Sequence, residues 1–399
     1  MIEWSEQQIM IRDAIRKFID GEIVPHLEEL EHGDLPPYDV LRKMLRTFGI
    51  DEVNRQRFRR MVERHQAIER GERPAAKPKG EGDGSGDSAA MQLIPIIELC
   101  RYCPGMVTAM GVSVGLTAAA VMSKGTLRQK LRWGEALMTM EKIGAWAITE
   151  PGSGSDAFGS MKATARRDGD VYVLSGNKTF ITNGPYADVI VFICKLDEPG
   201  VDAKNRKVLT FVLDKGMPGL TQSKPLRKMG LHSSPTGELF LEDVRAEPDR
   251  LLGETEKGPS REGAKDTFSI ERTGVAAMAL GIIERSLEMA VKYARERVQF
   301  GKPIGEFQLI QEKLARMEVA RLNVQTLVFR TIESAGQGRE LNLAEASAMK
   351  LYSARAAVEV ANDALQVFGG NGYMAEFGVE QLARDARVLQ IYAGTDEIQ

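Results

Sequence analysis

The chain holds few cysteine and histidine residues, which excludes several kinds of site. Its 399 residues include three cysteines and four histidines. Cys100 and Cys103 form a lone C-x-x-C pair, and no second pair or H-x-x-x-H spacing completes a set of zinc ligands. A thioredoxin-like role would need a neighbouring βαβ pattern, so we expect buried apolar thiols instead. Only His232, in a predicted loop, is a candidate site residue, and a solvated loop histidine is the simpler interpretation.

An excess of one charge and a long apolar run are also missing. The formal net charge of -3 offers no basic stripe for a nucleic acid. We find no run of about 18 apolar residues and therefore predict no membrane span. Segment 1–23 carries acidic residues between apolar residues at helical intervals, which indicates an amphipathic helix rather than a signal peptide. The sequence therefore predicts a cytoplasmic protein.

Length and periodicity predict three regions. A chain of 399 residues with 43% apolar content is expected to form two or three domains with ordinary globular cores. Helical periodicity up to residue 142 is interrupted at 73–89 by a polar insertion rich in Gly and Pro, which cannot bury enough surface to fold. The charged segment 55–73 before it is predicted as a solvated helix, with a partner-docking arm as the alternative.

Beyond residue 142 the pattern changes to strands and then returns to helices. Period-two runs and turn pairs in 143–255 indicate a small antiparallel sheet or barrel. We expect strands at 171–174, 179–182, 189–195 and 208–213, with a turn at 175–178. The helical period over 256–399 predicts long helices at 266–295, 307–334 and 343–367, which would pack as a bundle.

One segment, 149–156, has the composition of an anion-binding loop. Its Gly, Ser and Thr residues can expose backbone N–H groups and offer hydroxyls. A structural turn explains the same composition equally well. The segment is no Rossmann fingerprint, because its G-x-G lacks a third Gly and does not open a helix after a buried strand. A nicotinamide-binding fold is accordingly disfavoured.

Several segments, in order along the chain, resemble motifs of the acyl-CoA dehydrogenase family of flavoproteins. They are residues 146–156, 178–184, 295–304, 307–308, 366–373 and 391–395. The resemblance implies a multidomain α+β fold with an N-terminal helical domain (1–142), a middle antiparallel β domain (143–255) and a C-terminal four-helix bundle (256–399). It covers residues 143–399 well and the N-terminal helices loosely.

The resemblance also implies a cofactor, partners and an activity. The cofactor would be non-covalent FAD, and the partners an acyl-CoA substrate, an electron-transfer flavoprotein, and further copies of the chain in a homotetramer or homodimer. The implied enzyme is an oxidoreductase of fatty acid β-oxidation. It would remove the α proton of an acyl-CoA thioester while the β hydride goes to flavin N5, which gives a trans-2-enoyl-CoA.

Site residues follow from the same resemblance, position by position. The flavin and its ribityl side would contact Trp146, Ile148, Thr149, Ser155, Phe180 and Thr182. The FAD of a neighbouring subunit would be reached by Arg297, Gln299 and Phe300. The adenosine diphosphate end would be held by Gln308, Gln366, Val367, Phe368, Gly369 and Gly370, and the FAD would be closed over by Thr395 and Glu397. The substrate would contact Ser155, Arg272 and Ala393.

Taken singly, these residues have simpler interpretations. A flat flavin suits an aromatic neighbour such as Phe180, although a lone Phe is more often a core residue. Arg297 can pair with a diphosphate as a charged fork, although a lone helical Arg is usually solvated. The pair at 369–370 is equally typical of a helix C-cap.

The catalytic base is the main departure from the family pattern. Many members carry a Glu just before the final Gly-Thr, where this chain has Ala393. A subset, including isovaleryl- and long-chain-type enzymes, carries the base immediately before an Arg on the first long helix of the bundle, which matches Glu271 before Arg272. The isovaleryl type also has Ala at the position of Ala393. An ungapped match from Arg272 to Arg297 fixes this register.

The residues around Glu271 agree with this prediction. Small neighbours at 274, 276 and 277 would let a ligand approach the helix, and an apolar cleft raises the pKa of a carboxyl and makes it a stronger base. Ala393 could still donate the backbone N–H that, with a flavin ribityl hydroxyl, polarises the thioester carbonyl. The alternative is that Glu271 merely pairs with a surface cation.

Two other functions remain open from the sequence. One is an oxidase on the same fold that reduces O2 directly; nitroalkane-oxidase relatives use Asp as base, which disfavours that version. The other is a non-catalytic flavin-binding paralogue that has lost its base.

Overall fold

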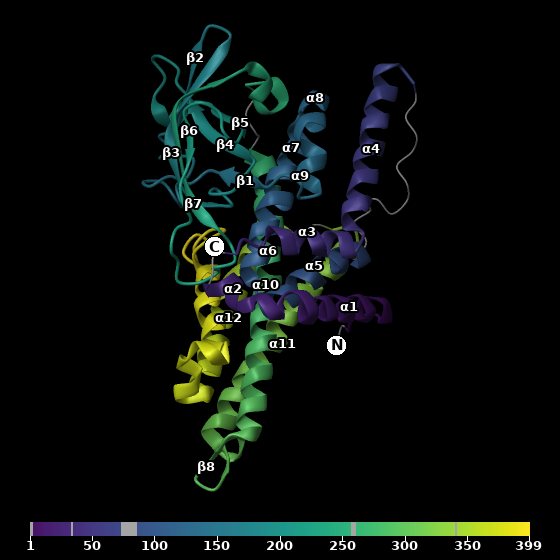
Figure 1. Cartoon of the computed structure of the whole chain (residues 1–399), viewed down its shortest axis with the longest axis vertical. Helices are drawn as coiled ribbons and strands as arrows, with labels where there is room; N and C mark the ends of the chain where they lie inside the picture. Colours follow the sequence, from purple (N-terminus) through teal and green to yellow (C-terminus); the bar gives the residue numbers. More distant parts are fainter. Residues whose placement is uncertain (1–2, 33–34, 73–85, 257–260, 340) are drawn as a thin grey trace.

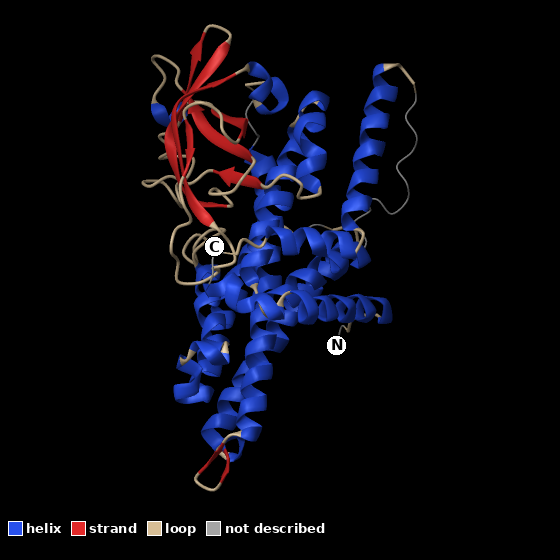
Figure 2. Cartoon of the chain, in the orientation of Figure 1, coloured by secondary structure: helices blue, strands red, loops and turns tan. Residues whose placement is uncertain are grey.

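Helices and one β domain make up the molecule. The computed structural model describes residues 3–32, 35–72, 86–256, 261–339 and 341–399. The β domain lies at one end, and long helices of the C-terminal region extend to the other (Figure 1). Figure 2 shows that strands are confined to the β domain and one small hairpin at the opposite end.

The N-terminal region is helical, as predicted. Its described helices are α1 (Glu6–Glu22), α2 (Leu27–His32), α3 (Tyr38–Thr47), α4 (Ile50–Glu69), α5 (Gly86–Cys100), α6 (Pro104–Met110), α7 (Ala119–Lys124), α8 (Leu127–Gln129) and α9 (Glu135–Met138). α1 begins at a capping box, in which Ser5 accepts from the N–H of Gln8 and the Gln8 side chain accepts from the N–H of Ser5. The buried residues Ile15, Phe18 and Ile19 form the apolar face predicted for this helix.

The predicted insertion at 73–89 falls mostly outside the described residues. Its last positions, 86–89, belong to the first turn of α5. The charged segment before it forms α4, which stands beside α9 at the edge of the molecule (Figure 1).

One helical stretch contradicts the prediction that no segment is long and apolar enough to cross a membrane. Pro104–Lys124 meets that condition by length and composition, because it holds no charged residue before Lys124. Half of it is buried inside the protein, and it packs against β1 and α5. These contacts are those of a core helix.

The described part of the β domain is a seven-stranded mixed sheet. Its strands are β1 (Gly144–Ala147), β2 (Thr164–Asp168), β3 (Val171–Thr182), β4 (Val189–Leu196), β5 (Val208–Asp214), β6 (Leu220–Gln222) and β7 (Thr236–Ala246). β4 pairs in parallel with both β1 and β2, and the other pairs are antiparallel. The prediction of an antiparallel sheet was therefore wrong for the pairing of β4 with β1 and with β2.

The predicted turn at 175–178 was also wrong. β3 continues through these residues as one strand, with register shifts against β7 after Leu174 and after Lys178. The Ser and Gly of this segment mark a β-bulge rather than a hairpin turn.

The C-terminal region is built on three long helices. They are α10 (Arg261–Glu296), α11 (Gln308–Gly336) and α12 (Leu343–Phe368), followed by the shorter α13 (Val379–Arg387). The hairpin of β8 (Val298–Gln299) and β9 (Lys302–Pro303) joins α10 to α11, which makes these two helices antiparallel. A capping box between Asn342 and Glu345 starts α12 where the helical pattern predicts it.

The prediction that the cysteines are buried agrees with the structure. Cys100, Cys103 and Cys194 are free and buried. Burial raises the pKa of the Cys100 and Cys103 thiols, so they are poor nucleophiles. Within the described residues, no group of three or more His, Cys, Asp or Glu side chains could hold a metal ion.

α5 crosses α10 with almost no space between the backbones. A Cβ added at Gly281 would lie 2.2 Å from the carbonyl oxygen of Ile97 and 2.8 Å from Cβ of Cys100. This close approach ties the N-terminal helices to the C-terminal bundle.

We therefore expect Gly281→Ala to destabilise the protein by about 1–3 kcal/mol, because α5 must move away from α10. Gly274→Ala on the same helix is the matched control: nothing lies within 4 Å of its added Cβ. This control should be neutral or stabilising, since Ala is favoured over Gly in a helix by about 1 kcal/mol. Thermal melting followed by circular dichroism compares the two, and equal melting temperatures would contradict the close packing.

Candidate functional site

The predicted site residues form three groups in the fold. The first group lies in the β domain: Trp146, Ile148, Thr149, Ser155, Phe180 and Thr182. The second lies near the N-terminal part of α10 and the C-terminal segment: Glu271, Arg272, Ala393, Thr395 and Glu397. The third lies around the hairpin at the far end: Arg297, Gln299, Phe300, Gln308, Gln366, Val367, Phe368, Gly369 and Gly370. Figure 1 shows the β domain and the hairpin at opposite ends of the molecule.

In the β domain, Phe180 is presented to the outside by an unusual backbone conformation. It occupies the bulge of β3 with φ of +57° and is 71% exposed. A bulky residue in this left-handed region is uncommon and marks a constrained position. An exposed aromatic ring of this kind suits the flat ring system of a flavin.

The bulge is bonded to the Thr149 segment. The N–H of Thr179 donates to the carbonyl of Thr149 (3.0 Å), and the Thr149 hydroxyl donates to the carbonyl of Thr179 (2.5 Å). The structure thus brings together segments 146–156 and 178–184, which resemble two separate motifs of the family. Ser155 is exposed in the loop after Thr149, while Trp146, Ile148 and Thr182 are half-buried.

Glu271, the predicted base, is a half-buried carboxyl on α10. Burial raises its pKa above the ordinary value of 4.5, and the charges of Arg272 and Lys350 oppose this increase. A carboxylate that is shielded from water and has a raised pKa is a stronger base, so it is suited to accept a proton.

The C-terminal segment forms a tight turn close to Glu271. Ala393 and Gly394 have φ of +52° and +88°, so two successive residues are left-handed. Their carbonyl groups accept from the Gln399 side chain at 3.0 and 2.9 Å. Among the described residues, no acceptor takes the backbone N–H of Ala393. The predicted role of this N–H as a donor to the substrate stays a prediction.

Lys350 is a site residue that the sequence reasoning missed. Its side chain on α12 is completely buried, and its ammonium donates to the carbonyl of Gly394 (2.6 Å) and lies 3.9 Å from Asp396. The signal was present, because Lys350 shares the buried helix face of Ala346, Ser353 and Ala357. A lysine on such a face needs buried partners.

Arg272 lies inside this group rather than on the surface. It donates to the hydroxyl of Ser347 (2.8 Å), and a Cβ at Gly394 would lie 3.6 Å from its guanidinium. Its role as a contact for an anionic CoA group stays a prediction, and its described contacts are with α12 and the C-terminal turn. Thr395 is half-buried in this turn and Glu397 is exposed.

At the far end, the C-terminal part of α10 and the end of α12 lie against one another. The rings of Tyr293 and Phe368 stack at 4.1 Å, and Asn371 donates to the Tyr293 hydroxyl (3.0 Å). Phe300 has φ of +52° and is 94% exposed at the tip of the hairpin. Exposed polar side chains of this group are those of Arg297, Gln299, Gln308 and Gln366.

Two members of this group cannot bind a ligand through their side chains. Val367 and Phe368 are buried in the bundle, so only their backbone could contribute. Gly369 has φ of +60° and caps α12, which agrees with the simpler interpretation of the Gly pair.

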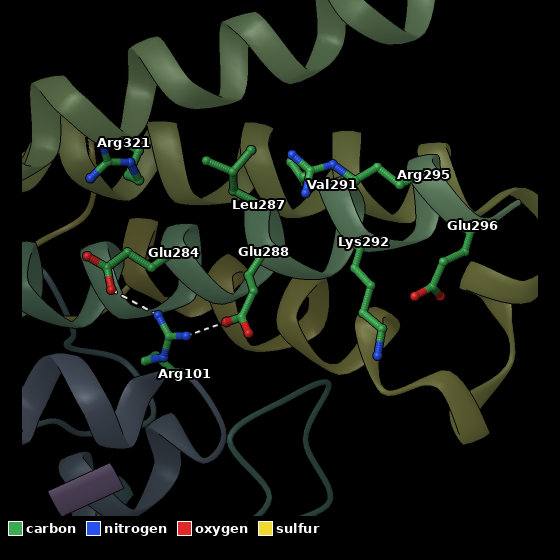
Figure 3. A pocket seen from close by; sticks show the side chains of 9 residues that line it. All are labelled: Arg101, Glu284, Leu287, Glu288, Val291, Lys292, Arg295, Glu296 and Arg321. Atoms are coloured by element: carbon green, nitrogen blue, oxygen red, sulfur yellow. Dashed lines mark hydrogen bonds and ion pairs between the residues drawn. The ribbon is translucent and has the colours of Figure 1, made fainter. Parts of the chain in front are cut away.

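Two other candidates lie outside these groups. His232 is in a loop as expected, but it is only partly exposed, and its ring nitrogens contact the carbonyls of Glu31 (2.7 Å) and Lys228 (2.8 Å). A cavity of about 620 Å³ lies along α10 and α11, where Arg101 bonds Glu284 and Glu288 (Figure 3). None of the predicted site residues lines this cavity.

The chain belongs to the acyl-CoA dehydrogenase family. The family models for the middle domain and the C-terminal domain of acyl-CoA dehydrogenases match residues 145–244 and 262–399. Among curated relatives, a 3-(aryl)acrylate reductase of Clostridium sporogenes is 35% identical and covers 99% of this chain and 97% of its own length. An acyl-CoA dehydrogenase of Bacillus subtilis is also 35% identical, over 99% and 96%. Subunit CarC of the caffeyl-CoA reductase–Etf complex of Acetobacterium woodii is 33% identical, over 99% and 97%.

Solved structures agree with this assignment. Butyryl-CoA dehydrogenase of Megasphaera elsdenii superimposes with a TM-score of 0.81 at 31% identity, covering 100% of this chain and 97% of its own. An acyl-CoA dehydrogenase of Bacillus anthracis complexed with FAD gives 0.79 at 29%, over 99% and 66%. The prolyl acyl carrier protein oxidase AnaB gives 0.81 at 28%, over 99% and 97%. The predicted fold and enzyme class, an oxidoreductase, are confirmed, and FAD is confirmed as the cofactor of the family.

The raised pKa of Glu271 gives the free energy of unfolding a pH dependence with a defined sign. The folded chain holds this proton more tightly than the unfolded chain, so stability from Glu271 falls as the pH rises from 4.5 towards the folded-state pKa. We expect the unfolding free energy of the wild type, relative to Glu271→Gln, to fall over this window in denaturant titrations at a series of pH values. A difference that stays flat or rises would show that Glu271 is not buried.

Proposed function

We propose that this chain is an acyl-CoA dehydrogenase that binds FAD and introduces an α,β double bond into an acyl-CoA thioester, with Glu271 as the base. The observation that carries this proposal is the half-buried Glu271 beside a turn in which the N–H of Ala393 has no described acceptor. Together they offer a base and a hydrogen-bond donor for one thioester. The family's enzymes act on such substrates, which agrees with this pair.

Glu271 would take the proton from the α carbon. Its raised pKa brings a carboxyl closer to the working pH, which favours proton transfer in both directions. The opposing charges of Arg272 and Lys350 keep part of the carboxyl ionised and therefore able to act as a base. The same group could return a proton to the α carbon, and two relatives are named reductases.

The N–H of Ala393 would donate to the thioester carbonyl oxygen. A donor fixed in place stabilises the negative charge that develops on this oxygen when the α proton leaves. Because only the backbone is needed, the Ala at this position is compatible with activity. Lys350 and Gln399 hold the neighbouring carbonyl groups and so keep this N–H in its orientation.

The β-domain group fits FAD. Phe180 offers an exposed aromatic ring, and the bonded Thr149 and Thr179 segments supply a rigid surface beside it. When bound, FAD supplies the acceptor for the β hydride at N5. Ile148 and Trp146 would line the same surface, with Ser155 at its edge and Thr182 beyond the bulge.

We further propose that a second copy of the chain completes the FAD site. Arg297, Gln299 and Phe300 lie at the end of the molecule opposite the β domain (Figure 1), so one chain cannot bring both groups to one cofactor. An almost fully exposed Phe at a hairpin tip is typical of a residue covered by a partner. A symmetric dimer or tetramer would satisfy this requirement.

Electron-transfer flavoprotein is the proposed electron acceptor, because CarC is named as part of an Etf complex. Direct reduction of O2 is the second candidate, favoured by the similarity to the oxidase AnaB. Comparing flavin reoxidation by electron-transfer flavoprotein and by air separates the two. A cytoplasmic location and a role in fatty acid β-oxidation stay predictions.

Glu271→Gln should retain bound FAD but lose about 100- to 10,000-fold in kcat, since it removes the base without changing the size of the side chain. Turnover of a panel of acyl-CoA substrates with an artificial electron acceptor measures this. Glu288→Gln is the control, because Glu288 is an exposed carboxylate on the same helix. An unchanged rate in Glu271→Gln would contradict the assignment of the base.

Mixing two inactive variants tests the shared site. Chains with Arg297→Ala should bind FAD weakly and be inactive, and chains with Glu271→Gln lack the base. A mixed dimer contains one site with an intact Glu271 and an intact Arg297 from its partner, so random mixing should restore roughly a quarter of the wild-type activity. No recovery after co-refolding or co-expression would show that each chain forms its site alone.

A further inference from the structure

A buried ion pair joins the two segments proposed to contact the flavin. Lys178 on β3 is completely buried, and its ammonium lies 2.9 Å from the carboxylate of Glu150, which is 5% exposed. The same ammonium donates to the carbonyl of Ile148 (2.9 Å) and lies 5.3 Å from the ring centre of Phe192. Burial lowers the pKa of Lys178, and Glu150 opposes this decrease.

Glu150 is fully engaged by three donors. One oxygen accepts from Lys178 and from the N–H of Ala163 (3.0 Å), and the other accepts from the N–H of Lys162 (2.7 Å). A buried carboxylate with this many hydrogen bonds is fixed in position. It therefore connects three segments of the β domain at one point.

The residues tied together by this pair flank the predicted flavin contacts. Ile148 and Thr149 immediately precede Glu150, and Phe180 is two residues beyond Lys178. The bulge places Phe180 in a left-handed conformation that local sterics disfavour. The contacts of Lys178 and Thr179 with residues 148–150 are available to hold it there.

We propose that Lys178, paired with Glu150, is a positioning residue for FAD that fixes the Phe180 bulge against residues 148–150 and neutralises the buried charge of Glu150 near the flavin. This inference rests on the proposed function, because it takes Thr149 and Phe180 as flavin contacts. A hydrophobic pair of the same size would fill the space but supply no bond to Ile148 and no charge. Charges near a flavin tune its reduction potential, so the pair acts on chemistry as well as on shape.

Two variants separate the effect of the lost bond to Ile148 from the effect of an uncompensated charge on Glu150. Lys178→Met removes the bond to Ile148 and leaves Glu150 as an unpaired negative charge. The double variant Lys178→Met with Glu150→Gln removes the same bond but restores a neutral site. Leu209→Ala is the control, because Leu209 is buried in the same domain on β5, a strand that pairs with β4 rather than with β3.

The experiment measures FAD affinity of the apoprotein by fluorescence quenching and the midpoint potential of the bound flavin by dye equilibration. We expect Lys178→Met to weaken FAD binding about tenfold or more and to make the potential more negative. In the double variant the affinity should stay weakened while the potential returns towards the wild-type value. Leu209→Ala should lower the melting temperature and leave both flavin properties unchanged.

Three outcomes would overturn this inference. The first is wild-type affinity and potential in Lys178→Met or in the double variant. The second is an equal loss of FAD affinity in Leu209→Ala at the same decrease in melting temperature, because the effect would then reflect stability alone. The third, a wild-type chain that takes up no FAD, would overturn the proposed function as well, which distinguishes it from the first two.

Discussion

The hydrogen bond from the buried ammonium of Lys350 to the carbonyl of Gly394 is the contact on which the site depends. It fixes the C-terminal turn to α12, and this turn orients the N–H of Ala393, for which the described residues offer no acceptor. The charge of Lys350 also lowers the pKa of Glu271 against the effect of burial. One buried lysine therefore connects the proposed donor with the proposed base, although it need not touch a substrate.

Much of the fold could be predicted from local patterns, and the errors have physical causes. The helical period predicted α12 nearly to the residue, and the capping box at Asn342 explains where this helix begins. β3 was mistaken for two strands, because a bulge and a turn use the same residue types and only pairing with β7 distinguishes them. The parallel pairing of β1 with β4 depends on contacts between distant segments, which local periodicity does not contain.

Part of the proposed site was predicted from the family resemblance. Glu271 was assigned by its place before an Arg and Phe180 by its motif, and both roles stay proposals. Lys178 and Lys350 were not found, because a lysine in a sequence is by default a solvated residue. Their partners, Glu150 and the carbonyl of Gly394, become neighbours only in the folded chain. The positive φ of Ala393 could not be predicted either, because it too is a property of the folded chain.

A crystal structure with FAD and a non-reactive acyl-CoA analogue would test the central claim most directly. The account predicts a carboxylate oxygen of Glu271 about 3–3.5 Å from the α carbon, on the face opposite the flavin. It also predicts that the thioester oxygen accepts from the N–H of Ala393. A different carboxylate facing the α carbon, or a thioester oxygen far from Ala393, would contradict the account.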